Sequence, residues 1–568
     1  MPFKYLAHIP TKLDYDWFFH AYEVLLQRLE ALDGRSSAEA WLELVAHWNE
    51  LKMVVRGERA RLDWDESLDA NDEGAAARAR AFRGQVRPLA TERNAQIRQA
   101  ILSAPAAASA VKARYGAFLV DQWECEEIAD NPVNIELDVA DQELATRYHA
   151  LRGQAQIEFR GETLTLTMLE KMLSASHDQA VRRGAFDVMM DWYRQNRDEL
   201  DGIYLEMVAL RDQAGRNLGF ENFIPLGYKR MGRLDYGPQE VAQFRDQVLR
   251  HVTPLVRQLR AEQAQLIGTD RVMPWNRNFM SNYSLPEGIS PPEKQFDGAA
   301  EIFRRLHPKL KAHFVHMVDS ELIDLENRPG KQGGAFCTSM PDRSEVRIFC
   351  NSTGAASDVR TLLHESGHAF QSWESQWIEA VELRSPTLEA CEIHSMGMEF
   401  LAYPHLSVFF DAENERKFKR GHLVEAMQFL CYACVVDGFQ HQVYTHPGMD
   451  ADQLADVWRE LWDQYMVGED WTGYDDELGT FWHHKLHIFS DPFYYIDYAL
   501  AQLCAVQLWG LSVQDPDDAL ERYLHLCRLG GTHSLSDLVS LAGLDDPFAE
   551  STLLNALDAV RAELGVSS

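Results

Sequence analysis

Cysteine is scarce in this sequence, with 8 residues in a chain of 568. Several of them stand inside apolar segments, so no disulfide framework is predicted. Cys431 and Cys434, in CYAC, form the only CxxC spacing, and no second pair completes a four-cysteine zinc site. We therefore interpret this pair as core packing on one helix face, not as a redox or metal site.

An excess of positive charge is also missing. Lys and Arg number 55 against 87 Asp and Glu, which gives a formal net charge of −32. Such a surface repels nucleic-acid phosphates and anionic lipid headgroups, and no basic cluster offsets this repulsion. We expect neither nucleic-acid nor membrane partners.

Long apolar runs are missing as well. No stretch supplies the roughly 18 uninterrupted apolar residues that a membrane helix requires, and polar residues interrupt the first segment, MPFKYLAHIPTKLDYDWFF. The chain is long enough for two or more domains or for one large multi-lobed enzyme. The sequence therefore predicts a soluble, cytoplasmic protein.

Helical patterns dominate what is present. Apolar residues recur at helical spacing in DYDWFFHAYEVLLQRLEAL, and another long helix, ending at its glycine, is indicated by HDQAVRRGAFDVMMDWYRQNRDELDGIYLEMVALRDQAG. Strand signals are few, and two of them, GGAFCTSM and EVRIFCN, flank the turn-like PDRS. The sequence predicts a mainly helical protein with a small antiparallel sheet beside the motif that follows.

That motif is TLLHESGHAF, in which two histidines stand four residues apart. On a helix such residues share one face, so His364 and His368 can direct ring nitrogens at one ion. Two imidazoles can hold Zn²⁺, which lowers the pKa of water, and Glu365 would then be the base that takes the proton. The alternative is a chance match on a buried helix whose histidines have other partners.

A catalytic zinc site usually needs a third protein ligand. No third histidine follows in an HxxGxxH extension, which argues against the three-histidine class. Glutamates follow instead, and one of them, on a second helix, would complete a His-His-Glu set. The candidates are Glu374, Glu379, Glu382, Glu389, Glu392 and Glu399.

With these motifs the sequence resembles the thimet oligopeptidase and oligoendopeptidase F family of zinc metallopeptidases, in particular its shorter Pz-peptidase-like members. The likeness extends from about Phe159 to Phe548. Three blocks carry it: IFCNSTGAASDVRTLLHESGHAFQSWES, EACEIHSMGMEF and HIFSDPFYYIDYALAQ.

The family pattern assigns the third ligand. In the family this ligand begins an ExxSxxxE pattern, on which Glu392, Ser395 and Glu399 fall. Glu389, one turn earlier, is the fallback ligand. The resemblance implies one Zn²⁺ per chain and a ligand set of His364, His368 and Glu392.

The third block supplies the expected substrate contacts. The family uses a histidine and tyrosines from it to bind the substrate carbonyl and stabilise the oxyanion, which implies such roles for His487, Tyr495 and Tyr498. SDPF replaces the family's glycine-rich stretch, so Tyr494 can exchange roles with Tyr495. Core packing is the alternative for most of these rings. His483 stands four residues before His487, but no glutamate base follows it, so substrate contact by His487 is preferred to a second metal pair.

The resemblance also gives the predicted sheet a role. In related enzymes a strand beside the zinc helix pairs with extended peptide substrate, and GGAF has the same small-residue character. Substrate contacts are therefore expected from Gly333, Gly334, Ala335 and Phe336. Asp358, before the motif, is expected either to cap the motif helix or to hydrogen-bond a ligand histidine.

The architecture that the family implies is two helical lobes around a deep substrate channel. We expect an N-terminal helical lobe at residues 1–200 and the catalytic region at 201–568. The expected function is a zinc-dependent endopeptidase that hydrolyses internal bonds of short peptides. Two alternatives are a related zinc carboxypeptidase, with arginines such as Arg230 holding the substrate carboxylate, and a non-catalytic peptide-binding protein. The sequence does not indicate an oligomeric state.

Overall fold

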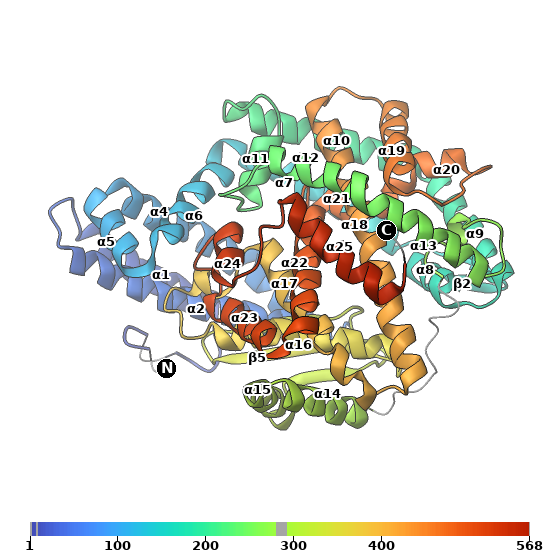
Figure 1. The fold of residues 1–568 in the computed structure, drawn as a ribbon. Helices are drawn as coiled ribbons and strands as arrows, with labels where there is room; N and C mark the ends of the chain where they lie inside the picture. Colours follow the sequence, from blue (N-terminus) through green and yellow to red (C-terminus); the bar gives the residue numbers. More distant parts are fainter. Residues whose placement is uncertain (1–2, 7–8, 280–291, 567–568) are drawn as a thin grey trace. The chain divides into compact units, whose positions relative to one another are not determined.

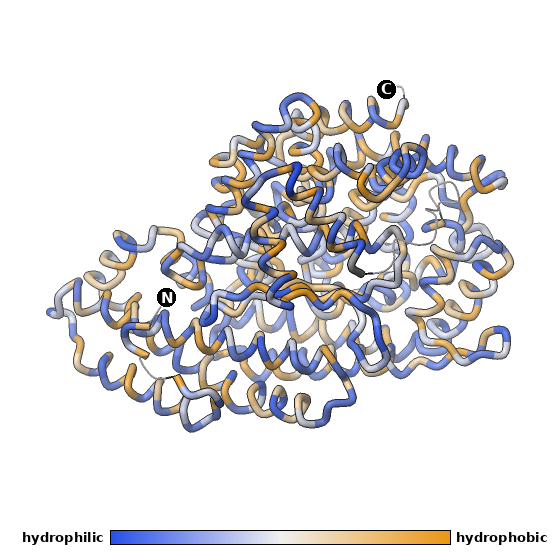
Figure 2. Tube along the Cα trace, turned by 90° about the horizontal axis from the view of Figure 1, so that it is seen from below, coloured by the Kyte–Doolittle hydropathy of each residue, from blue (hydrophilic) through white to orange (hydrophobic). Residues whose placement is uncertain are grey.

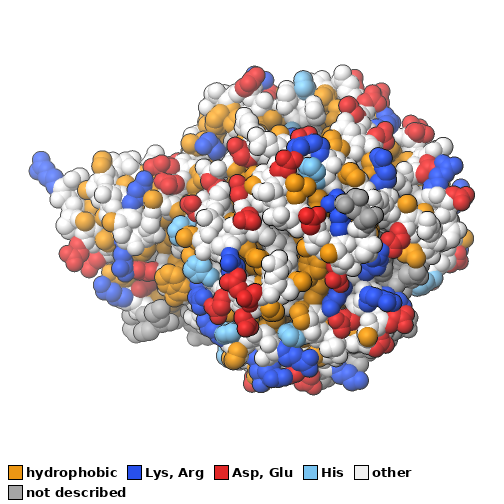
Figure 3. All heavy atoms as spheres, in the orientation of Figure 1, with side chains coloured by type: hydrophobic (Ala, Val, Ile, Leu, Met, Phe, Trp, Pro, Cys, Tyr) orange, Lys and Arg blue, Asp and Glu red, His pale blue; other side chains and the backbone are white. Residues whose placement is uncertain are grey.

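The computed structural model describes residues 3–6, 9–279 and 292–566, and it is 73% helical. This confirms the mainly α fold predicted from the apolar periodicity. Figure 2 shows hydrophilic and hydrophobic residues alternating along most helices, as expected where a helix buries one face. On the face drawn in Figure 3, acidic and basic side chains are interspersed, so the negative net charge is not gathered into one large patch there.

Contacts along the chain divide it into two compact units, each built from three segments. The first unit comprises Met1–Glu127, Pro286–Phe409 and Leu508–Leu544, and the second comprises Ile128–Leu285, Phe410–Gln507 and Asp545–Ser568. The boundary expected at residue 200 lies inside the second unit. The division into regions 1–200 and 201–568 stays a prediction. The compact units are not consecutive in sequence, because segments remote in sequence pack together.

The first unit combines helices with a three-stranded sheet (Figure 1). Its strands are β3 (Ile323–Glu326), β4 (Phe336–Met340) and β5 (Glu345–Ser352). The boundary between the units falls inside two helices, α6 (Ala117–Ala129) and α22 (Tyr495–Gln514), so each has residues in both units. The other helices are α1 (Tyr15–Glu30), α2 (Ala38–Leu68), α3 (Glu73–Ala81), α4 (Arg87–Ser103), α5 (Pro105–Tyr115), α14 (Pro292–Leu306), α15 (Pro308–Asp319), α16 (Ala356–Glu374), α17 (Leu388–Leu401), α23 (Pro516–Leu529) and α24 (Leu535–Leu541).

The described part of the second unit is mainly helical and carries one small antiparallel pair of strands, β1 (Ile157–Phe159) and β2 (Glu162–Leu164). Its longest helix is α18 (Ala412–Thr445). The other helices are α7 (Ile135–Gly153), α8 (Leu166–Ala175), α9 (Gln179–Gln195), α10 (Arg197–Asn217), α11 (Ile224–Arg230), α12 (Pro238–Gln247), α13 (Thr253–Leu266), α19 (Ala451–Tyr465), α20 (Asp475–Gly479), α21 (Leu486–Ser490) and α25 (Glu550–Leu564).

The second long helix expected from the sequence is in fact two helices, α9 and α10. The break falls at Asn196, which leaves helical geometry with φ −103° and ψ 10° and donates its side-chain amide to Trp192 O at 2.8 Å. The glycine expected to end the helix, Gly215, lies inside α10. A Cβ at Gly215 would lie 2.5 Å from Asn222 O, so this glycine permits a close backbone approach and does not act as a stop signal.

The sheet of the first unit positions the motif helix. β4 and β5 form the predicted antiparallel pair, with Thr338 opposite Arg347. A third strand, β3, runs parallel to β5, so the sheet is mixed, with the order β3-β5-β4 and β4 at its edge. β3 was not predicted because its four residues carry too short a pattern. α16 follows β5 and packs on β4 and β5 (Figure 1).

Buried residues decide two further points. Cys431 and Cys434 are fully buried in α18 as free thiols, which confirms that they pack in the core. By length and mean hydropathy α22 could cross a membrane, but 72% of the stretch is buried inside the protein, and a core helix has the same character. Its one charged residue, Asp497, forms a fully buried ion pair with Arg233.

Candidate metal centre

Helix α16 begins directly after β5, and Asp358 fixes its first turn. The Oδ2 oxygen of Asp358 accepts hydrogen bonds from the backbone N–H groups of Thr353, Gly354 and Ala355 at 2.8, 2.8 and 2.9 Å. The Ser352 hydroxyl donates a fourth, at 2.9 Å. These bonds satisfy backbone donors at the start of the helix. Of the two roles expected for Asp358, the geometry supports helix capping.

The three residues expected to bind the metal lie together on α16 and α17. The ring centroids of His364 and His368 are 5.1 Å apart. Glu392 Oε2 lies 3.4 Å from His364 Nε2 and 3.6 Å from His368 Nε2, and the three donor atoms lie within 4.8 Å of one another. Ligand atoms at about 2 Å from a tetrahedral ion lie roughly 3.3 Å apart. The donor set therefore fits one metal ion.

Two further residues of α17 hold this arrangement. Ser395 Oγ donates to Glu392 Oε2 at 2.8 Å. Glu399, two turns after Glu392, places Oε1 2.6 Å from His364 Nδ1. A carboxylate on Nδ1 orients the imidazole so that Nε2 is directed at the metal position. Glu389, the fallback ligand, is buried in the first turn of α17 and does not belong to the donor cluster.

The close packing of α16 on α17 depends on Gly367, which sequence reasoning did not single out. A Cβ at Gly367 would lie 2.4 Å from His394 O and 2.7 Å from Ser395 Cα. The buried hydroxyl of Tyr523, on α23, donates to the same His394 carbonyl at 3.0 Å. A glycine inside a helical motif, between two ligand histidines, was the signal that could have revealed this contact.

Burial and neighbouring carboxylates set different pKa values for the two histidines. Burial lowers the pKa of His364, but hydrogen bonds with Glu392 and Glu399 outweigh burial and raise the pKa to about 10. Burial lowers the pKa of His368 to about 4, against the attraction of Glu392. The two carboxylates thus create a negative potential at His364 that favours a positive charge. A metal cation at this position would match that potential.

Glu365 lies beside the donor cluster without belonging to it. It is 6% exposed, and its Oε2 atom has no hydrogen-bond partner among the described residues. Burial raises the pKa of Glu365 to about 7, against the opposing effect of His364. A buried carboxyl group with such a pKa is suited to exchange protons near neutral pH. The residues present therefore fit a metal ion with an adjacent acid–base group.

The segment expected to contact substrate lies at the edge of the sheet. Gly334, just before β4, has φ +94°, and a Cβ at Gly333 or Gly334 would meet no atom within 4 Å. Asn351 of β5 holds this segment, because its amide donates to Gly334 O at 2.8 Å. The ring of Phe336 is used in packing, stacked on Phe349 at 4.8 Å between centroids. The outer edge of β4 pairs with no strand in the described part of the chain.

His487 and the candidate tyrosines form one aromatic cluster in the second unit. The His487 ring lies 5.8 Å from Tyr494, 5.1 Å from Tyr495 and 6.0 Å from Tyr498 between centroids. The Tyr495 hydroxyl accepts a hydrogen bond from Lys485 Nζ at 3.1 Å. Burial, and then Lys485, lowers the pKa of His487 to about 4, so the imidazole is neutral at pH 7. The roles of these residues stay predictions.

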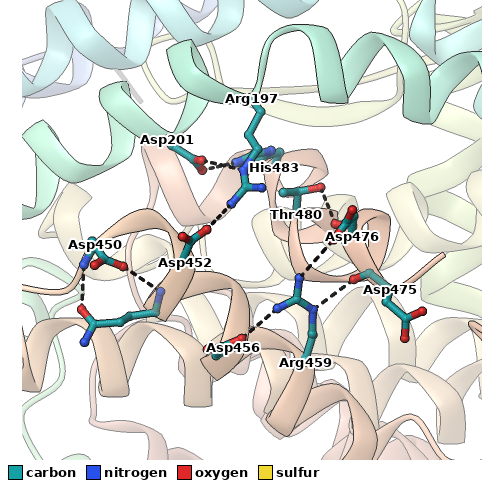
Figure 4. A network of polar contacts seen from close by, with 11 residues as sticks. Arg197, Asp201, Asp450, Asp452, Asp456, Arg459, Asp475, Asp476, Thr480 and His483 are labelled. Carbon is teal, nitrogen blue, oxygen red and sulfur yellow. Dashed lines mark hydrogen bonds and ion pairs between the residues drawn. The ribbon is translucent and has the colours of Figure 1, made fainter.

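His483 has a structural partner of its own. Its ring is fully buried, and Nε2 lies 2.8 Å from Asp201 Oδ1. Asp201 also accepts a hydrogen bond from Arg197 at 3.2 Å, and Arg197 reaches Asp452 on α19, as Figure 4 shows. These bonds tie α10 to α19 and to the segment before α21, which supports the expectation that His483 and His487 do not form a metal pair.

An HExxH helix, a second helix with an ExxSxxxE pattern and a mainly helical fold together define a metallopeptidase of the His-His-Glu type. The sequence pattern of Peptidase family M3 matches residues 172–557. The chain belongs to this family and is a metallo-oligopeptidase. The family favours neither the carboxypeptidase nor the non-catalytic alternative.

Solved structures agree with this assignment over the whole chain. Pz peptidase A, in a structure with an inhibitor, is 32% identical, with a TM-score of 0.88 and 99% of each chain covered. A protein given the name oligoendopeptidase F is 34% identical, with a TM-score of 0.88 and 100% of this chain and 99% of the other covered. Another of that name, from Bacillus anthracis str. Ames, is 30% identical, with a TM-score of 0.84 and 98% and 97% covered. A comparison with curated proteins gives no match.

Proposed function

We propose that the protein is a zinc-dependent endopeptidase that hydrolyses internal bonds of short peptides. The observation that carries this proposal is the cluster of His364, His368 and Glu392 beside the buried carboxyl group of Glu365. The names of two relatives, Pz peptidase A and oligoendopeptidase F, support the endopeptidase mode and peptide substrates.

The metal in this proposal is one Zn²⁺ per chain, held by His364, His368 and Glu392. Imidazole together with carboxylate is a donor set that suits zinc. When bound, zinc polarises a carbonyl group and lowers the pKa of water. The hydrogen bonds that His364 donates to Glu399 and that Ser395 donates to Glu392 orient two of the three ligands before metal is added.

Glu365 is the acid–base group in this proposal. It accepts the proton of the attacking water and delivers it to the leaving nitrogen. Its position directly after His364 places it beside the ligands, and its exclusion from the three-residue donor cluster supports a role in proton transfer over metal binding. The buried Oε2 atom, which has no partner among the described residues, supports the same role.

Substrate binding in this proposal uses both predicted regions. The backbone of Gly333, Gly334, Ala335 and Phe336 pairs with an extended peptide, which the open edge of β4 supports. Tyr495 and Tyr498 donate hydrogen bonds to the substrate carbonyl as negative charge develops, and neutral His487 is a further donor, with Tyr494 in contact with the peptide. The Tyr495 hydroxyl oxygen accepts a hydrogen bond from Lys485, so the hydroxyl hydrogen remains available to donate to the substrate carbonyl.

One experiment tests class and mode together. Metal content is measured by mass spectrometry, and cleavage sites are mapped on peptides blocked at both ends. We expect about one zinc per chain and cleavage at internal bonds. Cleavage that requires a free C-terminal carboxylate would instead indicate a carboxypeptidase, and zinc binding without any hydrolysis would indicate a peptide-binding protein.

We also propose a cytoplasmic location and no nucleic-acid or membrane partner. Every described cysteine is a free thiol, which suits a reducing compartment, and the net charge of −32 opposes binding to phosphates and anionic lipids. Cell fractionation tests the location. Recovery of the protein in a membrane pellet after a high-salt wash would contradict it.

A further inference from the structure

A cavity of about 310 Å³ lies in the first unit between the sheet and the start of α16. Its apolar part is formed by Leu325 of β3, by Cys350 of β5 and by Ala335, which precedes β4. Its polar part is formed by Asn351 and Ser352 of β5 and by Asp358 and Thr361 of α16. This volume is at the lower end of the range for small-molecule pockets, about 300–1,000 Å³, and suits a single long side chain.

The cavity adjoins the predicted machinery on two sides. Gly334 and Ala335, from the segment proposed to pair with substrate, line one side. Thr361, on the other side, stands three residues before His364, so the two side chains share one face of α16. The segment proposed to pair with substrate and the helix that carries the two histidine ligands therefore both line this cavity.

The charge of the lining is one-sided. Asp358 is the only charged side chain among the lining residues, and no lysine or arginine forms an ion pair with it in the part of the chain that the structure describes. All four of its hydrogen bonds come from neutral donors and end on Oδ2. No described donor binds the Oδ1 oxygen of Asp358.

We propose that this cavity is a specificity subsite for a lysine or arginine side chain of the peptide substrate. The aliphatic stem packs on Leu325, Ala335 and Cys350, and the cationic end approaches Asp358 Oδ1. Long basic side chains commonly combine such an apolar stem with a charged tip. The proposal rests on the proposed peptidase function and adds a substrate class to it. The net charge of −32 also favours basic peptides in the encounter.

The test uses one end-blocked, internally quenched peptide whose residues on both sides of the cleaved bond are replaced in turn by lysine, norleucine or glutamate. At one position we expect kcat/KM to follow the order lysine, norleucine, glutamate, with about a tenfold advantage of lysine over norleucine. Asp358→Asn keeps an acceptor for the capping bonds and should remove that advantage. Glu326→Gln removes a nearby exposed charge that does not line the cavity and should leave the preference unchanged.

A second variant separates the subsite from helix capping. Among the described residues the Thr361 hydroxyl donates to Ser357 O alone, within its own helix, at 3.3 Å, so Thr361→Leu fills the cavity without removing the cap. We expect this variant to lower kcat/KM for lysine peptides at the sensitive position about tenfold while peptides with glycine there change little. Equal losses for all peptides in both variants would overturn the proposal and leave Asp358 a purely structural cap.

Binding measurements keep the two proposals distinguishable. The affinities of the lysine, norleucine and glutamate peptides for the zinc-loaded protein are measured by fluorescence anisotropy. If no peptide is cleaved but lysine peptides bind in an Asp358-dependent way, the peptidase proposal fails and the subsite stands. If blocked peptides are cleaved with no Asp358-dependent preference at any position, the subsite fails and the peptidase proposal stands.

Discussion

The metal centre of the first unit and the aromatic cluster of the second unit both come from short sequence blocks, yet the sequence constrains them differently. His364 and His368 are one helical turn apart, and Glu392 and Glu399 are two turns apart, so helix geometry places each pair on one face. At the start of the aromatic block no helical spacing fixes which side chains share a face. Spacing inside a helix therefore determines a site more firmly than residue type near a turn.

The turn that precedes the tyrosines explains the difference. Phe493 has φ +69°, a conformation that ends regular structure, and α22 begins only at Tyr495. Tyr494 thus lies outside the helix, whereas Tyr495 and Tyr498 lie three residues apart within it and share a face. The choice between Tyr494 and Tyr495 stayed open because SDPF replaces the glycine-rich stretch that precedes the tyrosines in the family.

The largest effect is expected from removing the third metal ligand. Glu392→Ala should strongly reduce bound zinc and abolish peptide hydrolysis, because two imidazoles alone hold the ion weakly. Metal content after gel filtration checks this, and chelation of the wild-type protein should also abolish activity. Glu389→Ala is the matched control, one turn away and outside the donor cluster, and should retain zinc. The reverse result would move the third ligand to Glu389.

Loss of the acid–base group should leave the metal in place. Glu365→Gln should lower kcat by about a thousandfold or more, since the amide cannot accept the proton. The zinc content and the affinity for a peptide inhibitor should match the wild type. Parallel loss of zinc in this variant would contradict the division of roles between Glu365 and the three ligands.

The next test asks whether the tyrosines of the aromatic cluster take part in catalysis or only pack in the core. If Tyr498 donates to the oxyanion, Tyr498→Phe should lower kcat about 10²–10³-fold and change KM much less, because the bond matters mainly in the transition state. Tyr494→Phe and Tyr495→Phe, measured in the same assay, identify which of the two acts with it. Wild-type turnover in all three variants would leave only a packing role for the cluster.

The residues that orient the ligands should have smaller effects than the ligands themselves. Glu399→Gln should weaken zinc binding by about 10–100-fold, because a charged partner of His364 Nδ1 becomes neutral. Competition with a coloured chelator measures this affinity. Ser395→Ala should weaken it less, since Glu392 loses one neutral donor. Unchanged affinity in both variants would show that the two helices orient the ligands without these bonds.

The last prediction concerns the stability of the second unit. The substitution that tests it, Asp437→Asn, is expected to have the smallest effect on activity. Burial raises the pKa of Asp437, but His441 and Arg245 outweigh burial and lower it to about 2. The folded value lies below the unfolded one, so the contribution, about 2–3 kcal/mol, is present above pH 4 and is lost as the pH falls from about 4 to 2. Asp437→Asn should flatten the fall in the free energy of unfolding across this window. An unchanged acid limb in urea titrations would contradict it.

Local patterns allowed much of the fold and two of the three metal ligands to be predicted. The helices and the pair His364 and His368 follow from spacing within single elements, and the β4–β5 pair follows from two strand patterns around a turn. Glu392 was chosen among several glutamates only through the resemblance to the family. The break at Asn196 was missed because apolar periodicity continues through it. The parallel strand β3 was missed because its partner, β5, is remote in sequence and the strand itself is short.

By itself the sequence determined the two helices that carry His364, His368 and Glu392, since helical periodicity is a local property. Only the tertiary structure decided how these helices meet. Gly367 lets the α17 backbone approach α16, and that approach brings Glu392 to the two histidines and Glu399 to His364 Nδ1. Such contacts join residues separated by tens of positions, and their geometry depends on how side chains pack, which no spacing rule within one element contains.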